Sequence, residues 1–145
     1  MSHRTQNDFE RIQSLGVTLG RARNLVAAEV DAALKDVGIN SQQLSILLAL
    51  SRNAAGSAIG LSRMLAVDPA LMTRALDKLE ARGLVRRTRS ETDRRRVDIT
   101  VTQEGHDAIA RCERAAPTEP NVRLARFTNP EIETLGRLLG KLVDG

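Results

Sequence analysis

The sequence predicts a mainly helical fold with one small β-hairpin, and three observations support this. Apolar residues recur every three or four positions over most of the 145 residues, which is typical of amphipathic helices. Over residues 97–102 they alternate instead with polar residues, which is typical of a strand. Hydrophobic residues make up 41% and charged residues 28% of the chain, a composition that suits one folded unit with its own core.

The longest apolar stripe predicts a first helix over residues 9–37. No proline interrupts it, and Gly38 follows in a position that favours a left-handed cap. A helix of this length cannot cover its whole stripe against so small a core. We therefore expect part of the stripe, and the apolar face of the last helix, to pack against a second copy of the chain.

Residues that favour helix ends predict the next three helices. Asn40 or Ser41 can cap the second, which is leucine-rich and should be central. A short apolar stretch over residues 59–67 predicts the third. Asp68 then caps a fourth helix whose first position is Pro69, where a missing backbone N–H costs nothing. The short helix, tight turn and following helix form a helix-turn-helix pattern.

The remaining elements are a hairpin and two helices. Strands over residues 84–88 and 97–102 enclose a polar loop at residues 89–96. Thr102 can cap a fifth helix, and a last helix with a leucine-rich stripe begins at Asn129.

Positive charge is concentrated around the hairpin, in residues 82–96, which we call the basic cluster. It contains seven arginines against only Glu91 and Asp93, whereas the net charge of the whole chain is +4. The rest of the chain is therefore close to neutral. A charged run is often only a solvated face, but a surplus confined to one segment is expected of a surface that binds a polyanion.

Composition and residue spacing argue against several classes of protein. Aromatic residues make up 1% of the chain, so any bound nucleic acid is expected to be duplex, not a single strand stacked on rings. No stretch is apolar enough for a membrane span or a signal peptide, and the lone Cys112 cannot form an internal disulfide, which predicts a cytoplasmic protein. No metal-ligand spacing or catalytic set is present, so we expect neither an enzyme nor a cofactor.

Six short motifs carry a specific resemblance. They are LSRMLAVDP (residues 61–69), TR (73–74), DKLE (77–80), RGLVRR (82–87), DRR (93–95) and TQEG (102–105). In combination they resemble the multiple antibiotic resistance regulator (MarR) family, and as a pattern the likeness extends over nearly the whole chain. One departure is Ala66, at a turn position where that family often has glycine.

The resemblance implies a winged helix-turn-helix with a helical dimerisation arm, in the order four helices, strand, wing loop, strand, two helices. It implies a sequence-specific regulator of transcription, most readily a homodimeric repressor on a pseudopalindromic duplex operator, responsive to an anionic or phenolic ligand. We accordingly expect a dimerisation helix at residues 1–38, a DNA-binding lobe at residues 39–102 and C-terminal dimerisation helices at residues 103–145, all in one integrated unit. The operator, the regulated genes, the effector and the sign of regulation are not encoded in any recognisable motif.

The fourth helix is the expected recognition helix. Thr73, Arg74 and Lys78 project from the face opposite its apolar stripe, and a helix of this width fits the major groove of B-form DNA. Ala70 and Leu71 would add apolar contacts at its start. The alternative is an ordinary solvated helix face.

In the wing, the resemblance implies that Arg95 enters the minor groove and that Asp93 orients its guanidinium. A planar, weakly hydrated cation suits the narrow minor groove of A·T-rich DNA. The other arginines of the wing bind phosphates or pair internally, and the sequence does not separate these roles. They are Arg86, Arg87, Arg89, Arg94 and Arg96.

Two further sets of residues are candidates for binding. One set lies near helix N-termini and can reach backbone phosphates, although simple capping explains it equally well. It comprises Ser41, Gln42, Ser62 and Arg63. The other set lies near the ligand crevice that the resemblance implies between the dimer arm and the lobe. It comprises Arg21, Ser45 and Arg111.

Three alternatives remain open. Cys112 suggests a redox sensor, but sensors of the resembled family carry the cysteine near the first helix, and a small buried hydrophobe is the commoner role on the fifth. A winged-helix domain can also serve as a protein interaction module, which would not need the basic cluster. A nonspecific architectural DNA binder would share the charge but show little sequence preference.

Overall fold

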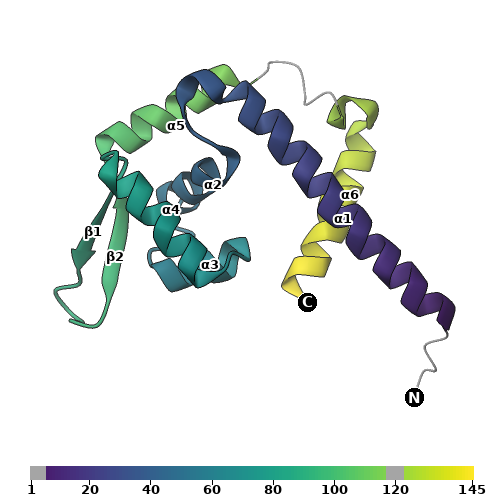
Figure 1. Ribbon diagram of the computed structural model, residues 1–145, viewed down its shortest axis with the longest axis horizontal. Helices are drawn as coiled ribbons and strands as arrows, with labels where there is room; N and C mark the ends of the chain where they lie inside the picture. The colour runs from purple at the N-terminus through teal and green to yellow at the C-terminus, as the bar shows by residue number, and fades with distance from the viewer. Residues whose placement is uncertain (1–5, 117–122) are drawn as a thin grey trace. The chain divides into compact units, whose positions relative to one another are not determined.

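The computed structural model describes residues 6–116 and 123–145. The chain forms two compact units (Figure 1). We call residues 31–116 the lobe, and residues 1–30 together with 117–145 the arm. In the part of the chain that is described, no helix is long and apolar enough to cross a membrane.

The lobe has the predicted order of helices and hairpin, which confirms the expected fold class. After the last turn of α1 (Gln6–Ala33), its elements are η1 (Lys35–Val37), α2 (Ser41–Ser51), α3 (Ala58–Leu65), α4 (Pro69–Ala81), β1 (Val85–Arg89), β2 (Val97–Val101) and α5 (Gln103–Ala115). Helices α3 and α4 form the helix-turn-helix. The β1–β2 hairpin, residues 85–101, is the wing.

A continuous apolar core holds the lobe together. Its largest fully buried side chains come from α2, α3, α4, α5 and β1, with Leu34 from the turn after α1, and α2 is central as predicted. They are Leu34, Ile46, Leu47, Leu61, Met72, Leu76, Leu79, Val85 and Cys112. Because this core closes within residues 31–116, the lobe positions α4 and the wing without help from the arm.

The predicted caps define where the lobe helices begin. Asn40 and Gln43 form a capping box, in which the Asn40 side chain accepts from the Gln43 N–H at 2.8 Å and the Gln43 side chain accepts from the Asn40 N–H at 3.1 Å. The Thr102 hydroxyl oxygen accepts from the Gly105 N–H at 3.1 Å at the start of α5. Each cap satisfies backbone donors that a helix N-terminus leaves free.

The wing is a two-stranded antiparallel sheet that projects beyond the helices of the lobe (Figure 1). Val85 pairs with Val101 at its base and Arg89 with Val97 near its end. The Ile99 N–H donates to the Gly56 carbonyl at 3.0 Å, which ties the free edge of β2 to the loop before α3. The core thus anchors the wing through Val85 and Ile99 and leaves its end exposed.

The fifth helix packs within the lobe of a single chain, and the expected part of residues 103–145 in dimerisation stays a prediction. Its buried face is Gly105, Ala108, Ile109 and Cys112, and it packs against α2, β2 and η1. A Cβ at Gly105 would overlap the Leu84 carbonyl oxygen, so only glycine permits this approach. The small residues on this face explain why α5 lies so close to the lobe.

The arm consists of α1, η2 (Leu124–Arg126) and α6 (Asn129–Asp144). Helix α1 ends at Ala33 and not at residue 37, because a 3₁₀ turn follows and Gly38 takes the expected left-handed conformation with φ 72°. Arg123 Nε pairs with Glu29 Oε1 at 2.7 Å. No local pattern in the sequence predicted η2.

Helix α6 begins at Asn129 as predicted, and Thr128 is its N-terminal cap. Glu131 Oε2 accepts from the Thr128 N–H at 2.8 Å and is 3.0 Å from its hydroxyl. The backbone hydrogen bond, and then the hydroxyl, lower the pKa of the Glu131 carboxyl from its usual value.

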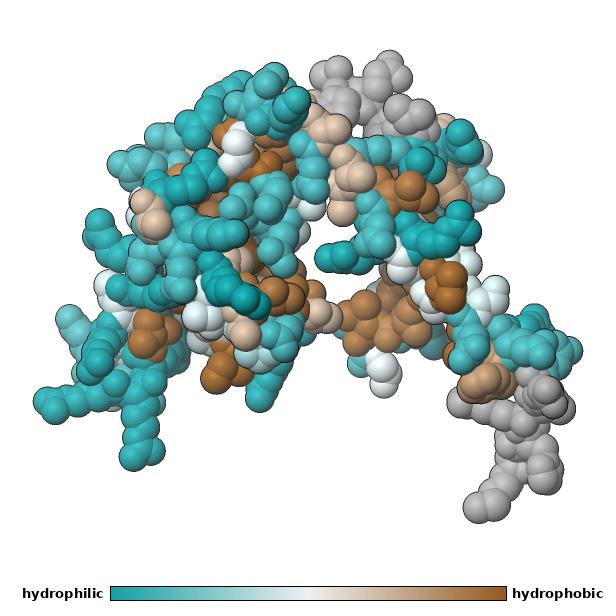
Figure 2. Space-filling model, viewed as in Figure 1, coloured by the Kyte–Doolittle hydropathy of each residue, from teal (hydrophilic) through white to brown (hydrophobic). Residues whose placement is uncertain are grey.

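No described residue of the arm is buried within one chain. Apolar side chains lie on the surface of both arm helices, where Figure 2 shows them in brown. They are Phe9, Ile12, Leu15, Val17 and Leu25 on α1, and Ile132, Leu135, Leu138, Leu139, Leu142 and Val143 on α6. Most of them lie on the stripes that the sequence predicted to pack against a second copy, whereas Val17, Leu25 and Val143 lie off those stripes.

Candidate nucleic-acid interface

Helix α4 is held by one face, and its opposite face is exposed. Met72, Ala75, Leu76 and Leu79 are buried against the lobe. All five residues expected to contact DNA lie on the exposed side. They are Ala70, Leu71, Thr73, Arg74 and Lys78. Leu71 is 50% exposed and so presents an apolar side chain on this outer face.

The start of α4 has no free backbone donor. Pro69 has no N–H, and Asp68 Oδ1 accepts from the N–H groups of Ala70 at 2.9 Å and Leu71 at 3.3 Å. The Met72 N–H donates to the Asp68 carbonyl at 2.9 Å. One turn on, the Thr73 hydroxyl donates to the Pro69 carbonyl at 3.0 Å.

A groove of about 340 Å³ lies between the start of α2 and the exposed face of α4. It brings together Gln42 from α2 with Leu71, Arg74 and Lys78 from α4, which the sequence had placed in separate sets. Asn40 and Gln43, which form the capping box of α2, also line it. Their second role depends on the packing of α2 against α4, which no local signal encodes.

The basic cluster divides into internal and free arginines. Arg87 Nη1 pairs with Asp77 Oδ1 at 2.6 Å and with Glu80 Oε1 at 3.4 Å, and Arg87 Nη2 donates to the Thr73 carbonyl at 3.3 Å. Arg82 Nη1 donates to the Gly38 carbonyl at 2.6 Å. These two side chains hold α4 against the wing and against the segment that follows α1.

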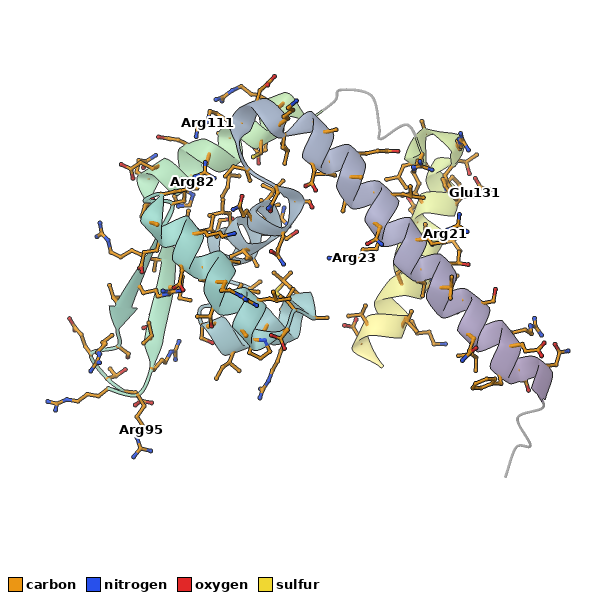
Figure 3. The ribbon with its side chains drawn as sticks, in the orientation of Figure 1. Arg21, Arg23, Arg82, Arg95, Arg111 and Glu131 are labelled. Carbon is orange, nitrogen blue, oxygen red and sulfur yellow. The ribbon has the colours of Figure 1, made fainter. Side chains whose placement is uncertain are left out.

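Four arginines of the basic cluster have free guanidinium groups. Within residues 6–116 and 123–145 these groups make no hydrogen bond or ion pair. They are Arg86, Arg89, Arg94 and Arg95. Figure 3 shows Arg95 at the end of the wing, with its side chain directed away from the lobe. Unpaired cations on a projecting hairpin retain their full charge for a polyanion.

The wing loop is ordered by its own polar groups. The Ser90 N–H donates to the Arg96 carbonyl at 2.9 Å, and the Arg96 N–H donates to the Asp93 carbonyl at 3.0 Å. The resemblance had implied that Asp93 orients the guanidinium of Arg95. In the structure, Asp93 Oδ1 instead accepts from the backbone N–H of Arg95 at 3.0 Å, so Asp93 fixes the backbone of Arg95. Arg96 Nε pairs with Asp98 at 2.7 Å.

The four residues expected near backbone phosphates differ in accessibility. Gln42 lines the groove and Arg63 is exposed. The Ser41 N–H donates to Asp31 Oδ1 at 2.6 Å, so the protein's own carboxylate occupies this donor of α2. Ser62 is 7% exposed, and its hydroxyl oxygen has no hydrogen-bond partner among the described residues. Because its side chain faces the lobe interior, we leave Ser62 out of the proposed contacts.

The residues expected near a ligand crevice fall in both units. Arg21 lies on α1 in the arm, whereas Ser45 and Arg111 lie on α2 and α5 in the lobe. All three are exposed, and the Ser45 hydroxyl donates to the Ser41 carbonyl at 2.9 Å. A crevice that joins them stays a prediction.

Cys112 has the environment of a core residue. Its side chain is buried, and burial raises the pKa of the thiol from its ordinary value, against the smaller opposing effect of Arg111. Since the thiolate is the reactive form, this environment disfavours peroxide chemistry.

Known proteins show the same pattern in sequence and in structure. The sequence profile of the MarR family matches residues 39–97. The HTH-type transcriptional repressor Rv2887 of Mycobacterium tuberculosis is 33% identical over 128 residues, which are 88% of this chain and 92% of that protein. The chain belongs to the MarR family.

Solved structures of MarR-family proteins extend the likeness to the fold. A cysteine-to-serine mutant of Escherichia coli MarR, complexed with operator DNA, is 26% identical with a TM-score of 0.81 over 92% of this chain and 96% of that chain. Bordetella bronchiseptica BpsR, whose DNA binding is regulated by 6-hydroxynicotinic acid, is 25% identical with a TM-score of 0.78 over 90% of this chain and 93% of that one. This MarR-family member is therefore a transcriptional regulator of the DNA-binding type.

Proposed function

We propose that this MarR-family protein is a sequence-specific, homodimeric repressor that binds a pseudopalindromic duplex operator and releases it when an effector binds. The observation that carries the DNA-binding part is the division of the basic cluster. Among the described residues, the guanidinium groups of Arg86, Arg89, Arg94 and Arg95 have no partner, and they lie on the wing of the same lobe that exposes the outer face of α4. E. coli MarR, which shares this fold, is known in complex with operator DNA.

The two DNA-contacting regions have different tasks. Arg74 can fork onto guanine O6 and N7 in the major groove, with Lys78 and Gln42 beside it in the groove between α2 and α4. Arg95 reaches the minor groove that flanks the site, and Arg89 and Arg94 contact phosphates. Arg96 forms an ion pair with Asp98 and is therefore a weaker candidate for a DNA contact.

The arm supports a homodimer. Its apolar stripes on α1 and α6 are exposed in a single chain, and exposed stripes of this extent mark an interface in soluble proteins. A twofold pair of lobes then places two recognition helices in successive major grooves when they are one helical turn of DNA apart, about 34 Å. A pseudopalindrome follows from that symmetry.

The effector is proposed to be a small aromatic or phenolic anion. BpsR is regulated by an aromatic acid of this kind, and the residues predicted for the ligand crevice, Arg21, Ser45 and Arg111, are the candidates for mutation. A ligand that separates or rotates the lobes needs a differential affinity of only about 1–3 kcal/mol to weaken operator binding some 5- to 150-fold.

Selection of duplexes from a random pool tests the proposal. We expect enrichment of a symmetric sequence that is bound at least a thousandfold more tightly than random duplex at the same salt concentration. Equal affinity for all duplexes would replace this proposal by an architectural DNA binder, and no binding to duplex would replace it by a protein interaction module. A compound screen on the selected duplex then tests the effector, because the operator must weaken ligand binding by the same factor as the ligand weakens operator binding.

A further inference from the structure

The first turn of the recognition helix offers DNA nothing but hydrocarbon. The four positions from Pro69 to Met72 have no free backbone N–H, because Pro69 has none and Asp68 accepts from the other three. The side chains that this turn exposes belong to Pro69, Ala70 and Leu71, and Met72 is buried. A surface without a free donor or a polar side chain cannot read a base edge by hydrogen bonding.

The major groove presents one apolar feature that differs between bases, the C5-methyl group of thymine. Leu71 is the side chain best placed to meet it, because it is 50% exposed and lines the same groove as Arg74 and Lys78. Leu71, Arg74 and Lys78 form one stripe at helical spacing along α4. If Arg74 contacts one base, Leu71 therefore faces a neighbouring base.

We propose that Leu71 determines specificity by contact with a thymine 5-methyl group in each operator half-site. This inference rests on the proposed function, since it requires that α4 occupies the major groove. On this proposal, the start of the recognition helix recognises a base by apolar contact, and the residues from Arg74 onward recognise bases by hydrogen bonding. Asp68 has the complementary role of occupying the donors that would otherwise bind a phosphate at this helix N-terminus.

Deoxyuridine tests this directly, because it pairs like thymidine and lacks only the 5-methyl group. In the duplex selected above, each thymidine of a half-site is replaced singly by deoxyuridine, and the affinity of the full-length protein is measured at fixed salt. We expect one or two positions at which affinity falls roughly fourfold, the value for exposing about one methyl group. At those positions Leu71→Ala should bind the thymidine and deoxyuridine duplexes equally.

Two matched variants separate this contact from general loss of binding. Leu71→Met keeps an apolar side chain of similar size and should keep the sensitivity to deoxyuridine. Arg74→Ala should bind more weakly to every duplex yet keep the same ratio between thymidine and deoxyuridine. Since Leu71 lies outside the core, thermal melting should show that all three variants are folded.

The inference is overturned if no deoxyuridine substitution in the half-site changes the affinity, or if Leu71→Ala keeps the full sensitivity. Failure of the proposed function is a different result, because the protein would then select no duplex before any deoxyuridine is introduced.

Discussion

The lobe and the arm differ in how they bury apolar side chains. The lobe closes a core among its own helices and wing, in which Ile46, Leu47, Leu61, Leu76 and Leu79 are 0% exposed. The arm leaves large apolar side chains at 37–78% exposure on both of its helices. A single chain thus buries the core of the lobe but leaves the apolar side chains of the arm exposed to solvent. The contrast teaches that one chain is enough to build the surface proposed to read DNA, whereas a twofold arrangement of two such surfaces requires a second chain.

Breaking the arm should have the largest effect. Replacing Leu138 and Leu142 by glutamate places charges on the exposed stripe of α6, and we expect sedimentation to show a particle of 15.8 kDa in place of twice that mass. Because the second half-site is then lost, operator affinity should fall at least about 100-fold. Glu133→Gln, on the same helix, should leave the mass and affinity unchanged. A double variant that stays dimeric would show that α6 is not part of the interface.

Overfilling the lobe should have the next largest effect. Gly105→Ala forces a methyl group against the Leu84 carbonyl, and overpacking of this kind costs about 1–3 kcal/mol of unfolding free energy. Gly56→Ala is the control, since a Cβ there meets nothing within 4 Å. Urea unfolding at one protein concentration measures both. Equal stability of the two variants would mean that α5 does not approach the lobe as closely as described.

Relieving a strained turn should stabilise the lobe. Ala66 ends α3 with φ 50° and ψ 45°, a left-handed conformation that costs an L-residue about 1–2 kcal/mol. Glycine relieves this strain but also increases the conformational entropy of the unfolded chain, which offsets part of the gain. Ala66→Gly should therefore raise the unfolding free energy by about 0.5–1 kcal/mol. Ala110→Gly, inside α5, should lower it by about as much. Destabilisation by Ala66→Gly would refute the left-handed turn.

Removing the unpartnered hydroxyl of Ser62 should have the smallest effect. Ser62→Ala deletes a buried group that has no hydrogen-bond partner in the described part of the chain, so the unfolding free energy should stay constant or rise by up to about 1 kcal/mol. Operator affinity should not change, because this side chain faces inward. A tenfold loss of affinity with stability unchanged would restore Ser62 as a phosphate contact.

Local signals made much of this fold predictable. Asn40, Asp68 and Thr102 act within three residues of their own position, so the sequence alone indicates the helices they begin. The alternation around Ile99 likewise indicates β2. The apolar stripe of α4 also indicates which face is buried, so the exposure of the opposite face was predictable, and its contact with DNA stays a prediction.

Contacts between distant elements were not predictable. The partners of Arg82 and Arg87 lie on other elements, so nothing in the basic cluster distinguishes these two from Arg95. Asp31 reaches the start of α2 only because the chain turns back after α1. The burial of Ser62 was not predictable because α3 spans only 8 residues, too short a helix for its apolar spacing to define which side is buried.

The salt dependence of operator binding in two arginine variants tests the central claim most directly. That claim is that free arginines of the wing bind DNA while the internally paired ones position α4. Arg95→Ala should reduce the slope of log K against log salt by about one unit, the value for one lost phosphate-type contact. Arg87→Ala should leave that slope unchanged while lowering the unfolding midpoint, because its charge is already paired with Asp77 and Glu80. An equal reduction of the slope in both variants would contradict the account.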